Sequence, residues 1–237
     1  MNNEHFTART ELLIGADCVQ QLYQKCVMVV GLGGVGSYAT EALARVGIGN
    51  LILIDGDVVS LSNCNRQLYA LQSTLGQYKT EVAKQRIHDI SPQTQVLVHT
   101  KWVRPDNMQE FFQIRPDYIV DAIDQVDAKV ALLVEAKRHN LPIISVMGTG
   151  NQLTAEHFCV EDISKTHNCP LARAVRLRLR KEGIYSGIKV LYSTRPKLLP
   201  NYEGWSLESR RPPGSISFVP PVAGMLAAGE VVRDLLQ

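Results

Sequence analysis

The chain has 237 residues, 45% of them hydrophobic and 20% charged, with a formal net charge of +2. This suits one large soluble domain, or one domain with a modest extension. Five scattered cysteines without a CxxC pair argue against a disulfide framework and against a Cys-rich structural zinc site. The sequence shows no signal-peptide pattern and no uncharged run of about 18 apolar residues. We therefore expect a cytoplasmic protein without a membrane span.

The first 25 residues begin polar and then predict an amphipathic helix around Asp17 to Tyr23. Arg9 precedes this helix, in the segment FTARTELLIG. On its own, such an arginine is most simply a solvated surface charge.

The residues from Val27 to Asp55 have the pattern of a nucleotide-binding unit. An apolar strand leads into GLGGVG, with glycines at positions 31, 33, 34 and 36, and then come a helix (about 37–46), a second strand (51–54) and Asp55. Glycines let the backbone approach phosphate oxygens, and the N–H groups of the helix's first turn point at the anion. An acid about 20 residues further on can hold ribose hydroxyls. The pattern indicates an adenine nucleotide and leaves both NAD and ATP open.

A polar segment follows where a compact crossover would be expected. Residues 56–76 contain a cluster of Ser, Asn, Arg and Gln side chains that includes Arg66, and a helix from about Gln77 to Asp89 follows, with Lys79 in its first turn. A lysine there opposes the helix dipole unless an anion is near. Arg66 and Lys79 together suit the charge of a triphosphate. The alternative is two solvated surface cations.

The next segment completes an alternating strand and helix pattern as far as residue 150. We expect a strand at 94–99, a helix at 105–113, a strand running out through 117–124, a helix at about 126–140 and a strand at 141–147 before the small-residue turn Gly148-Thr149-Gly150. This predicts an α/β fold with a doubly wound, mostly parallel Rossmann-like sheet and helices on both faces. Asp124, at the carboxyl end of its strand, could hold a Mg²⁺ that bridges phosphates. It could instead cap the following helix, although Asp127 could also fill that position.

The remainder, residues 151–237, is a basic C-terminal extension. It predicts a strand at 156–161, a helix at Pro170–Lys181, a flexible loop at about 192–214 and an apolar C-terminal helix for core or subunit packing. Between Lys165 and Arg211 there are eleven Lys or Arg residues and three Glu. This local surplus suggests a phosphate-rich partner, nucleic acid first, through Arg173, Arg176, Arg180 and Lys181. A solvated helix face is the alternative.

Four ordered motifs carry a family resemblance: GLGGVG at 31–36, LIDGDVVSLSNCNRQ at 53–67, GQYK ending at Lys79, and VDAIDQVDAK at 120–129. Together they resemble the ubiquitin-activating-enzyme-like superfamily, whose members adenylate a carboxylate with MgATP. The resemblance covers most of residues 6–150. It implies a single adenylating domain with its nucleotide-binding core at 1–150.

The resemblance also implies roles for individual residues. Gly31, Gly33, Gly34 and Gly36 would form the nucleotide loop, Asp55 would bind ribose, Asn63, Arg66, Gln67 and Lys79 would contact the phosphates, and Asp124 would position Mg²⁺. Arg66, Lys79 and Asp124 would carry the catalysis. Arg9 matches an N-terminal arginine that reaches the ATP of the other subunit, which implies a homodimer.

Within the superfamily, the chain lacks the two CxxC pairs common in the sulfur-carrier activators. Residues 160–184 and the ending SISFVPPVAGMLAAGEVV are similar to the tRNA threonylcarbamoyladenosine dehydratases. That similarity implies ATP-dependent cyclisation of a modified adenosine beside the tRNA anticodon through an acyl-adenylate, and it leaves a sulfur-trafficking protein partner open. The alternatives are adenylation of the Gly-Gly terminus of a ubiquitin-like sulfur carrier, and an NAD(P)-binding oxidoreductase or regulator.

Overall fold

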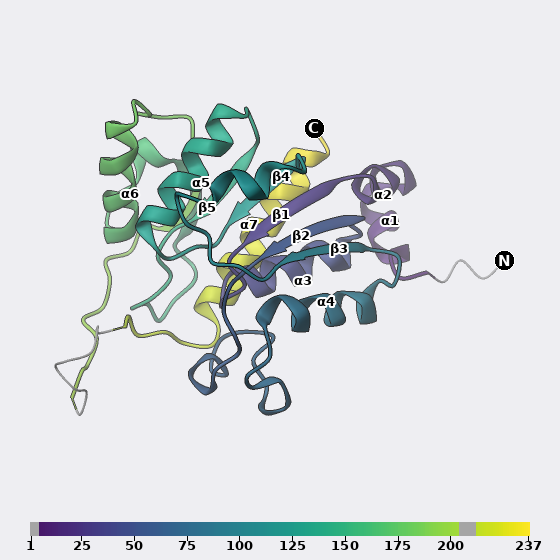
Figure 1. The fold of residues 1–237 in the computed structure, drawn as a ribbon, viewed down its shortest axis with the longest axis horizontal. Helices are drawn as coiled ribbons and strands as arrows, with labels where there is room; N and C mark the ends of the chain where they lie inside the picture. Colours follow the sequence, from purple (N-terminus) through teal and green to yellow (C-terminus); the bar gives the residue numbers. More distant parts are fainter. Residues whose placement is uncertain (1–4, 204–211) are drawn as a thin grey trace.

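A single sheet runs through the computed structural model, which describes residues 5–203 and 212–237. Within those residues the sheet has seven strands in the order β3-β2-β1-β4-β5-β7-β6, and Figure 1 labels β1 to β5. All neighbours are parallel except β6 and β7, which are antiparallel. The strands are β1 (Cys26–Val30), β2 (Asn50–Ile54), β3 (Gln95–His99), β4 (Tyr118–Asp121), β5 (Ile143–Val146), β6 (Phe158–Asp162) and β7 (Lys189–Ser193).

Both faces of the sheet are buried because apolar residues follow one another without interruption along its central strands. In β1, Val27 and Val29 pack on one face, whereas Met28 and Val30 pack on the other. Helices α2 (Ala16–Tyr23), α3 (Gly36–Val46), α4 (Lys79–Ile90) and α7 (Val219–Leu235) contribute to the core on the first face. Helices α5 (Val126–Arg138) and α6 (Pro170–Lys181) contribute to the core on the second. Continuous apolar strands between two helical layers are typical of parallel sheets. The doubly wound α/β fold expected from the sequence is therefore confirmed.

The helices are α1 (Ala8–Ile14), α2 (Ala16–Tyr23), α3 (Gly36–Val46), α4 (Lys79–Ile90), α5 (Val126–Arg138), α6 (Pro170–Lys181) and α7 (Val219–Leu235), with short 3-10 turns at Leu61–Asn63, Gln72–Thr74, Met108–Phe112 and Ile163–Lys165. None of the helices in these described ranges has the length and apolarity needed to cross a bilayer.

Three segments differ from the sequence-based expectation. The helix expected at 105–113 is only the 3-10 turn Met108–Phe112, which buries Met108 and Phe111 against the sheet. Helix α1 was not expected, since its residues show no buried face. Strand β7 was missed altogether, and Tyr192 belongs to it and not to the predicted loop. The middle of that predicted loop, residues 204–211, lies outside the described residues.

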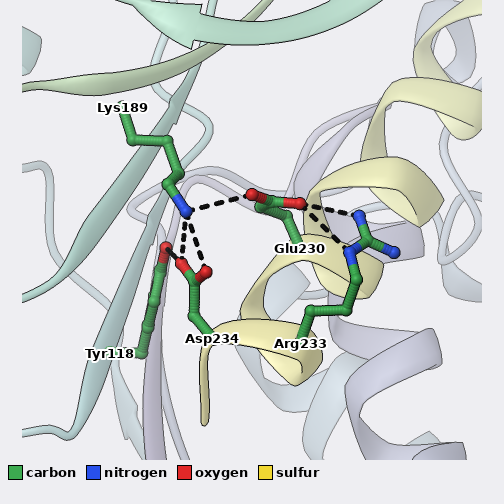
Figure 2. Close-up of polar contacts among 5 residues, drawn as sticks. All are labelled: Tyr118, Lys189, Glu230, Arg233 and Asp234. Carbon is green, nitrogen blue, oxygen red and sulfur yellow. Dashed lines mark hydrogen bonds and ion pairs between the residues drawn. The ribbon is translucent and has the colours of Figure 1, made fainter. Parts of the chain in front are cut away.

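Helix α7 is fastened to the sheet by a polar cluster (Figure 2). The Lys189 ammonium on β7 lies 3.0 Å from Glu230 Oε1 and 2.6 Å from Asp234 Oδ2, and the Tyr118 hydroxyl on β4 donates to Asp234 at 2.6 Å. Arg233 adds a second cation on Glu230, and the pKa of Glu230 lies below its usual value because of Arg233 and Lys189. Lys189 is therefore neutralised inside the fold and is not part of a free basic surface.

Candidate functional site

A cavity of about 580 Å³ opens at the carboxyl ends of the central strands. The chain leaves β1 for β2 on one side and later returns to place β4 on the other. Ligands of open α/β sheets bind at such a switch point. Most of the residues named from the sequence line this cavity: Gly31, Gly33, Gly34, Asp55, Asn63, Arg66, Gln67, Lys79, Asp124 and the turn 148–150. The structure thus gathers residues spread over 120 positions, whereas Gly36 and Arg9 do not line the cavity.

The glycines of the loop after β1 meet two different demands. A Cβ on Gly36 would lie 1.7 Å from the carbonyl oxygen of Gly31, so helix α3 can begin directly against the loop only without a side chain there. Gly31 has a φ of +89°, and its Cβ would lie 2.9 Å from the Ala122 carbonyl oxygen. The nearest atom to a Cβ on Gly33 is Gln67 Nε2 at an ordinary 3.7 Å. Gly36 and Gly31 shape the loop, and Gly33 leaves its surface open to the cavity.

Asp55 fixes the same loop from the end of β2. Its Oδ2 accepts the Leu32 N–H at 2.6 Å, and its Oδ1 accepts the Asp57 N–H at 2.8 Å. Burial raises the pKa of Asp55, while Lys79 and these two N–H groups act against that rise. Each carboxylate oxygen keeps acceptor capacity beyond one bond. The side chain can hold the loop and still accept a hydroxyl group.

The polar segment between β2 and α4 folds back on itself. A bridge between Val58 and Tyr78 closes it, and the Lys79 N–H donates to the Asp57 carbonyl oxygen at 3.1 Å. This brings the Lys79 ammonium to 2.7 Å from Asp57 Oδ2, with the Lys79 side chain 4% exposed. A lysine near a helix N-terminus opposes the helix dipole, and the Asp57 carboxylate offsets that repulsion for Lys79. Sequence reasoning missed this residue, although the run LIDGD contains it.

Arg66 follows the 3-10 turn Leu61–Asn63, and its N–H donates to the Asn63 carbonyl oxygen at 3.0 Å. The Asn63 side chain accepts the Ser60 N–H, and the Arg66 guanidinium donates to the Ser62 carbonyl oxygen at 2.9 Å and to Asn65 Oδ1 at 2.7 Å. Burial lowers the pKa of Arg66, and the negative charge of Asp124 opposes this. The guanidinium is therefore held at the cavity wall and faces Asp124.

Asp124 lies on the exposed loop between β4 and α5. Helix α5 has Gln125 at its N-cap, without a side-chain cap hydrogen bond, so Asp124 is not used as the cap. In the described part of the chain, no three His, Cys, Asp or Glu side chains gather into a metal-binding group. A Mg²⁺ between phosphates takes only one or two carboxylates, with the remaining ligands from phosphate and water. An exposed carboxylate on the cavity wall fits that requirement.

A buried ion pair lies beneath this loop. The Lys129 ammonium donates to Asp121 Oδ2 at 2.7 Å, to Ser145 Oγ at 3.1 Å and to the Val146 carbonyl oxygen at 3.0 Å. Asp121 Oδ1 accepts the Ile123 N–H at 3.0 Å. Lys129 and Asp121 are both fully buried. This cluster joins the carboxyl ends of β4 and β5 and so holds two walls of the cavity together.

The second half of the cavity comes from the C-terminal part of the chain. Together with the turn 148–151, three segments line this half: the start of α6 (Cys169, Pro170 and Leu171), Lys197 after β7, and the residues Pro212, Pro213 and Ser215. The Lys197 ammonium donates to the Gly148 carbonyl oxygen at 2.5 Å. Sequence reasoning counted Lys197 only as one charge among eleven. Strand β7 was not predicted, and without it the position of Lys197 at the cavity could not be inferred.

Arg9 is placed away from this cavity. It lies exposed on α1, and α1 and α2 sit at the end of the sheet where β1 begins (Figure 1). The cavity lies at the opposite end of β1, where Gly31 follows the strand. Arg9 does not serve the site of its own chain in this structure.

Some cations of the basic helix α6 have partners within the fold, and others do not. Arg178 forms an ion pair with Asp127 on α5, and Arg176 donates to the Thr166 carbonyl oxygen at 2.9 Å and to the Thr166 hydroxyl. Arg173, Arg180 and Lys181 are exposed, and none has a side-chain partner within residues 5–203 and 212–237. The free charge of the helix is therefore smaller than the sequence count suggests.

Comparison with known proteins decides the family. The family model described as "ThiF family" matches residues 7–237. The chain belongs to the ThiF family. Among curated relatives of this ThiF-family chain, the tRNA threonylcarbamoyladenosine dehydratase of Bacillus subtilis is 41% identical over 98% of this chain and 95% of that protein. The sulfur carrier protein ThiS adenylyltransferase of Escherichia coli is 30% identical but covers 59% of this chain and 56% of that protein.

Solved structures give the same result for this member of the ThiF family. The chain is similar to the tRNA N6-threonylcarbamoyladenosine dehydratase of E. coli, TcdA, crystallised in complex with ATP. The TM-score is 0.88, with 33% identity over 97% of this chain and 93% of that chain. The resemblance named from the four motifs and the C-terminal segment is confirmed.

Substitution of two glycines of the loop distinguishes the one needed for backbone packing from the one that only lines the cavity. We expect Gly36→Ala to lower the free energy of unfolding by at least about 3 kcal/mol, because backbone must move to admit its Cβ. Gly33→Ala should lower the free energy of unfolding by less than about 1 kcal/mol, as most surface substitutions do. Urea unfolding followed by circular dichroism measures both. Equal losses would contradict this division of roles.

Proposed function

We propose that this protein uses ATP to dehydrate threonylcarbamoyladenosine in tRNA to its cyclic form. The observation that carries the proposal is the extent of the match. Relatives named tRNA threonylcarbamoyladenosine dehydratase align over 78% to 98% of the chain, whereas the sulfur carrier protein ThiS adenylyltransferase of Escherichia coli aligns over 59%. The cavity is lined by residues of the nucleotide-binding core and by residues of the C-terminal extension, so a match over nearly the whole chain includes the whole cavity.

The first step is adenylation of the threonyl carboxylate. A carboxylate oxygen forms a bond to the α-phosphorus of ATP, and the bond to the leaving pyrophosphate breaks. Arg66 and Lys79 provide fixed positive charge on the cavity wall, where charge grows on the phosphates. Lys79 would exchange Asp57, now 2.7 Å away, for phosphate oxygens. Catalysis is mainly positioning and charge neutralisation.

Asp124 would hold the Mg²⁺ that accompanies ATP. When bound, that ion would neutralise part of the negative charge of the triphosphate. Asp55 would take the ribose hydroxyls while it keeps its bond to the Leu32 N–H. The glycine loop and the first turn of α3 would accept the phosphates.

Ring closure completes the reaction. The carbamoyl nitrogen forms a bond to the activated carbonyl carbon and loses its proton, while AMP leaves with the former carboxylate oxygen. The net change in the nucleoside is loss of one water. The nitrogen and the carbonyl belong to one side chain, so this step is intramolecular and gains from proximity.

A direct assay tests this function. We expect the wild-type protein to form AMP from ATP only with tRNA that carries threonylcarbamoyladenosine, and mass spectrometry should show loss of one water from that nucleoside. Asp124→Ala and Arg66→Ala should each lower the rate by at least about 100-fold, the usual effect of removing a group that stabilises developing charge. Asp89→Ala and Arg115→Ala, exposed charges away from the cavity, serve as controls.

The outcomes of this assay are distinct. AMP formation that depends on a protein ending in Gly-Gly, and not on modified tRNA, would assign sulfur-carrier adenylation instead. Full activity in both site variants would remove Asp124 and Arg66 from the mechanism.

We also propose that two copies form the working enzyme, with Arg9 of one copy at the nucleotide of the other. Helix α1 has no buried residue, and Leu12 and Leu13 on it are 81% and 84% exposed. The folded-back segment beside the cavity also exposes large apolar side chains, including Leu61 and Tyr78. Exposed apolar surfaces of this kind are typical of protein interfaces. Contact between α1 of one copy and this segment of the other would bring Arg9 to the cavity across the interface.

A mixing experiment tests the contribution of Arg9 from a second copy. We expect Arg9→Ala and Asp124→Ala to be inactive alone, and an equimolar mixture to recover about one quarter of wild-type activity, because half of random two-fold dimers would contain one intact site. The rate of AMP formation after subunit exchange measures this. No recovery, with exchange demonstrated by mass spectrometry, would place Arg9 in its own subunit's site or outside catalysis.

The exposed cations of α6 are proposed as tRNA contacts. We expect Arg173→Glu with Arg180→Glu to weaken tRNA binding and to lower the slope of log affinity against log salt by about two, one for each lost phosphate contact. Lys84→Glu with Arg115→Glu makes the same charge change elsewhere and should leave the slope unchanged. Equal effects from the two pairs would show that only net charge matters.

A further inference from the structure

Four cations among the described residues line the cavity, and they differ in which group lies opposite their charge. Lys79 pairs with Asp57, and Lys101 pairs with Glu110 at 2.7 Å. Arg66 faces the negative charge of Asp124. Lys197 differs from these three, because no carboxylate of the described residues faces it, and its one hydrogen bond within those residues goes to the Gly148 carbonyl oxygen.

The backbone around Lys197 is tied to the floor of the cavity. The Leu198 N–H donates to the Asn151 carbonyl oxygen at 2.8 Å, and the Gly214 N–H donates to Asn151 Oδ1 at 2.7 Å. These bonds anchor the chain after β7 to the turn that follows β5. The residue next to Lys197 is therefore hydrogen-bonded directly to the turn that lines the cavity.

Its place in the cavity separates it from the nucleotide machinery. The glycine loop, Asp55, Arg66 and Lys79 line one half, whereas Lys197 lies with Gly148 and Cys169 in the half that the C-terminal part of the chain supplies. Burial lowers the pKa of Lys197, and the nearby charged form of Cys169 acts in the opposite sense. Because no carboxylate pairs with this ammonium in the described chain, an anion from a ligand would stabilise its charged form.

We propose that Lys197 binds the carboxylate of the threonylcarbamoyl group and holds it for attack on the α-phosphorus. This inference rests on the function proposed above. A carboxylate approaching a triphosphate meets like charge, and a cation on its own side of the cavity offsets that repulsion. The Lys197 ammonium has three N–H donors, and Gly148 takes one of them. Two donors remain for the two carboxylate oxygens.

A phosphate of the tRNA backbone could use the same donors, so the experiment must separate it from the carboxylate. Unmodified tRNA has the same backbone but lacks the threonylcarbamoyl group. A residue that binds the carboxylate affects only the modified tRNA, whereas one that binds backbone phosphate affects both. The comparison between the two tRNAs is therefore the main measurement.

The test uses full-length Lys197→Met and Lys197→Arg with Lys165→Met as the matched control, since Lys165 is an exposed lysine outside the cavity. Binding of both tRNAs is measured with a non-hydrolysable ATP analogue, and KM values are measured for ATP and for modified tRNA. We expect Lys197→Met to weaken binding of modified tRNA by about tenfold or more, the effect of one charged hydrogen bond. Binding of unmodified tRNA and the KM for ATP should not change, which also shows that the variant is folded.

Lys197→Arg keeps the charge and should recover part of the loss. Equal weakening for both tRNAs, or no weakening for either, would overturn the carboxylate assignment. Failure of the function itself is seen separately, in the wild-type protein: it would not distinguish modified from unmodified tRNA and would form no AMP with either.

Discussion

The ion pair between Lys129 and Asp121 is the constraint on which the rest of the site depends. Both side chains are fully buried, so their charges are stable only because each is paired and hydrogen-bonded. All three N–H donors of the Lys129 ammonium are used. Besides Lys129, the Ser145 hydroxyl donates to Asp121 Oδ2 and the Ile123 N–H donates to Asp121 Oδ1. Removal of one partner from such a pair usually costs about 3–5 kcal/mol. The pair therefore fixes the end of β4 against the end of β5.

This junction lies between the two halves of the cavity. One side of it leads to Asp124 and the nucleotide half, and the other leads through Val146 to Gly148 and the half that contains Lys197. In the proposed mechanism, a shift of β4 against β5 would change the distance between the phosphate groups and the carboxylate that attacks them. Since effective concentration depends steeply on such distances, the proposed chemistry needs a junction that keeps β4 and β5 in register.

Patterns of apolar and glycine residues were sufficient to predict the nucleotide half, because its elements are continuous in sequence. The run from Val27 to Asp55 forms the expected strand, loop, helix and strand. In the C-terminal part, α6 has the predicted bounds Pro170–Lys181 for the same reason. Side-chain pairs between distant segments could not be predicted in the same way. Asp57 and Lys79 are 22 residues apart and meet only because the chain between them folds back.

Local charge counts were the least informative part of the sequence. Of the cations counted in the basic extension, Lys189 pairs with Glu230 and Asp234, and Arg178 pairs with Asp127. Those partners lie in other elements, which a count along the chain cannot include. The missed strand β7 explains the position of both Lys189 and Lys197, since one lies at its start and the other just beyond its end. A single short strand thus gives two lysines of the same segment opposite surroundings: two carboxylates around Lys189, and the open cavity beside Lys197. The position of a cation relative to the sheet, and not its number in the sequence, determines whether it stabilises the fold or remains available to a ligand.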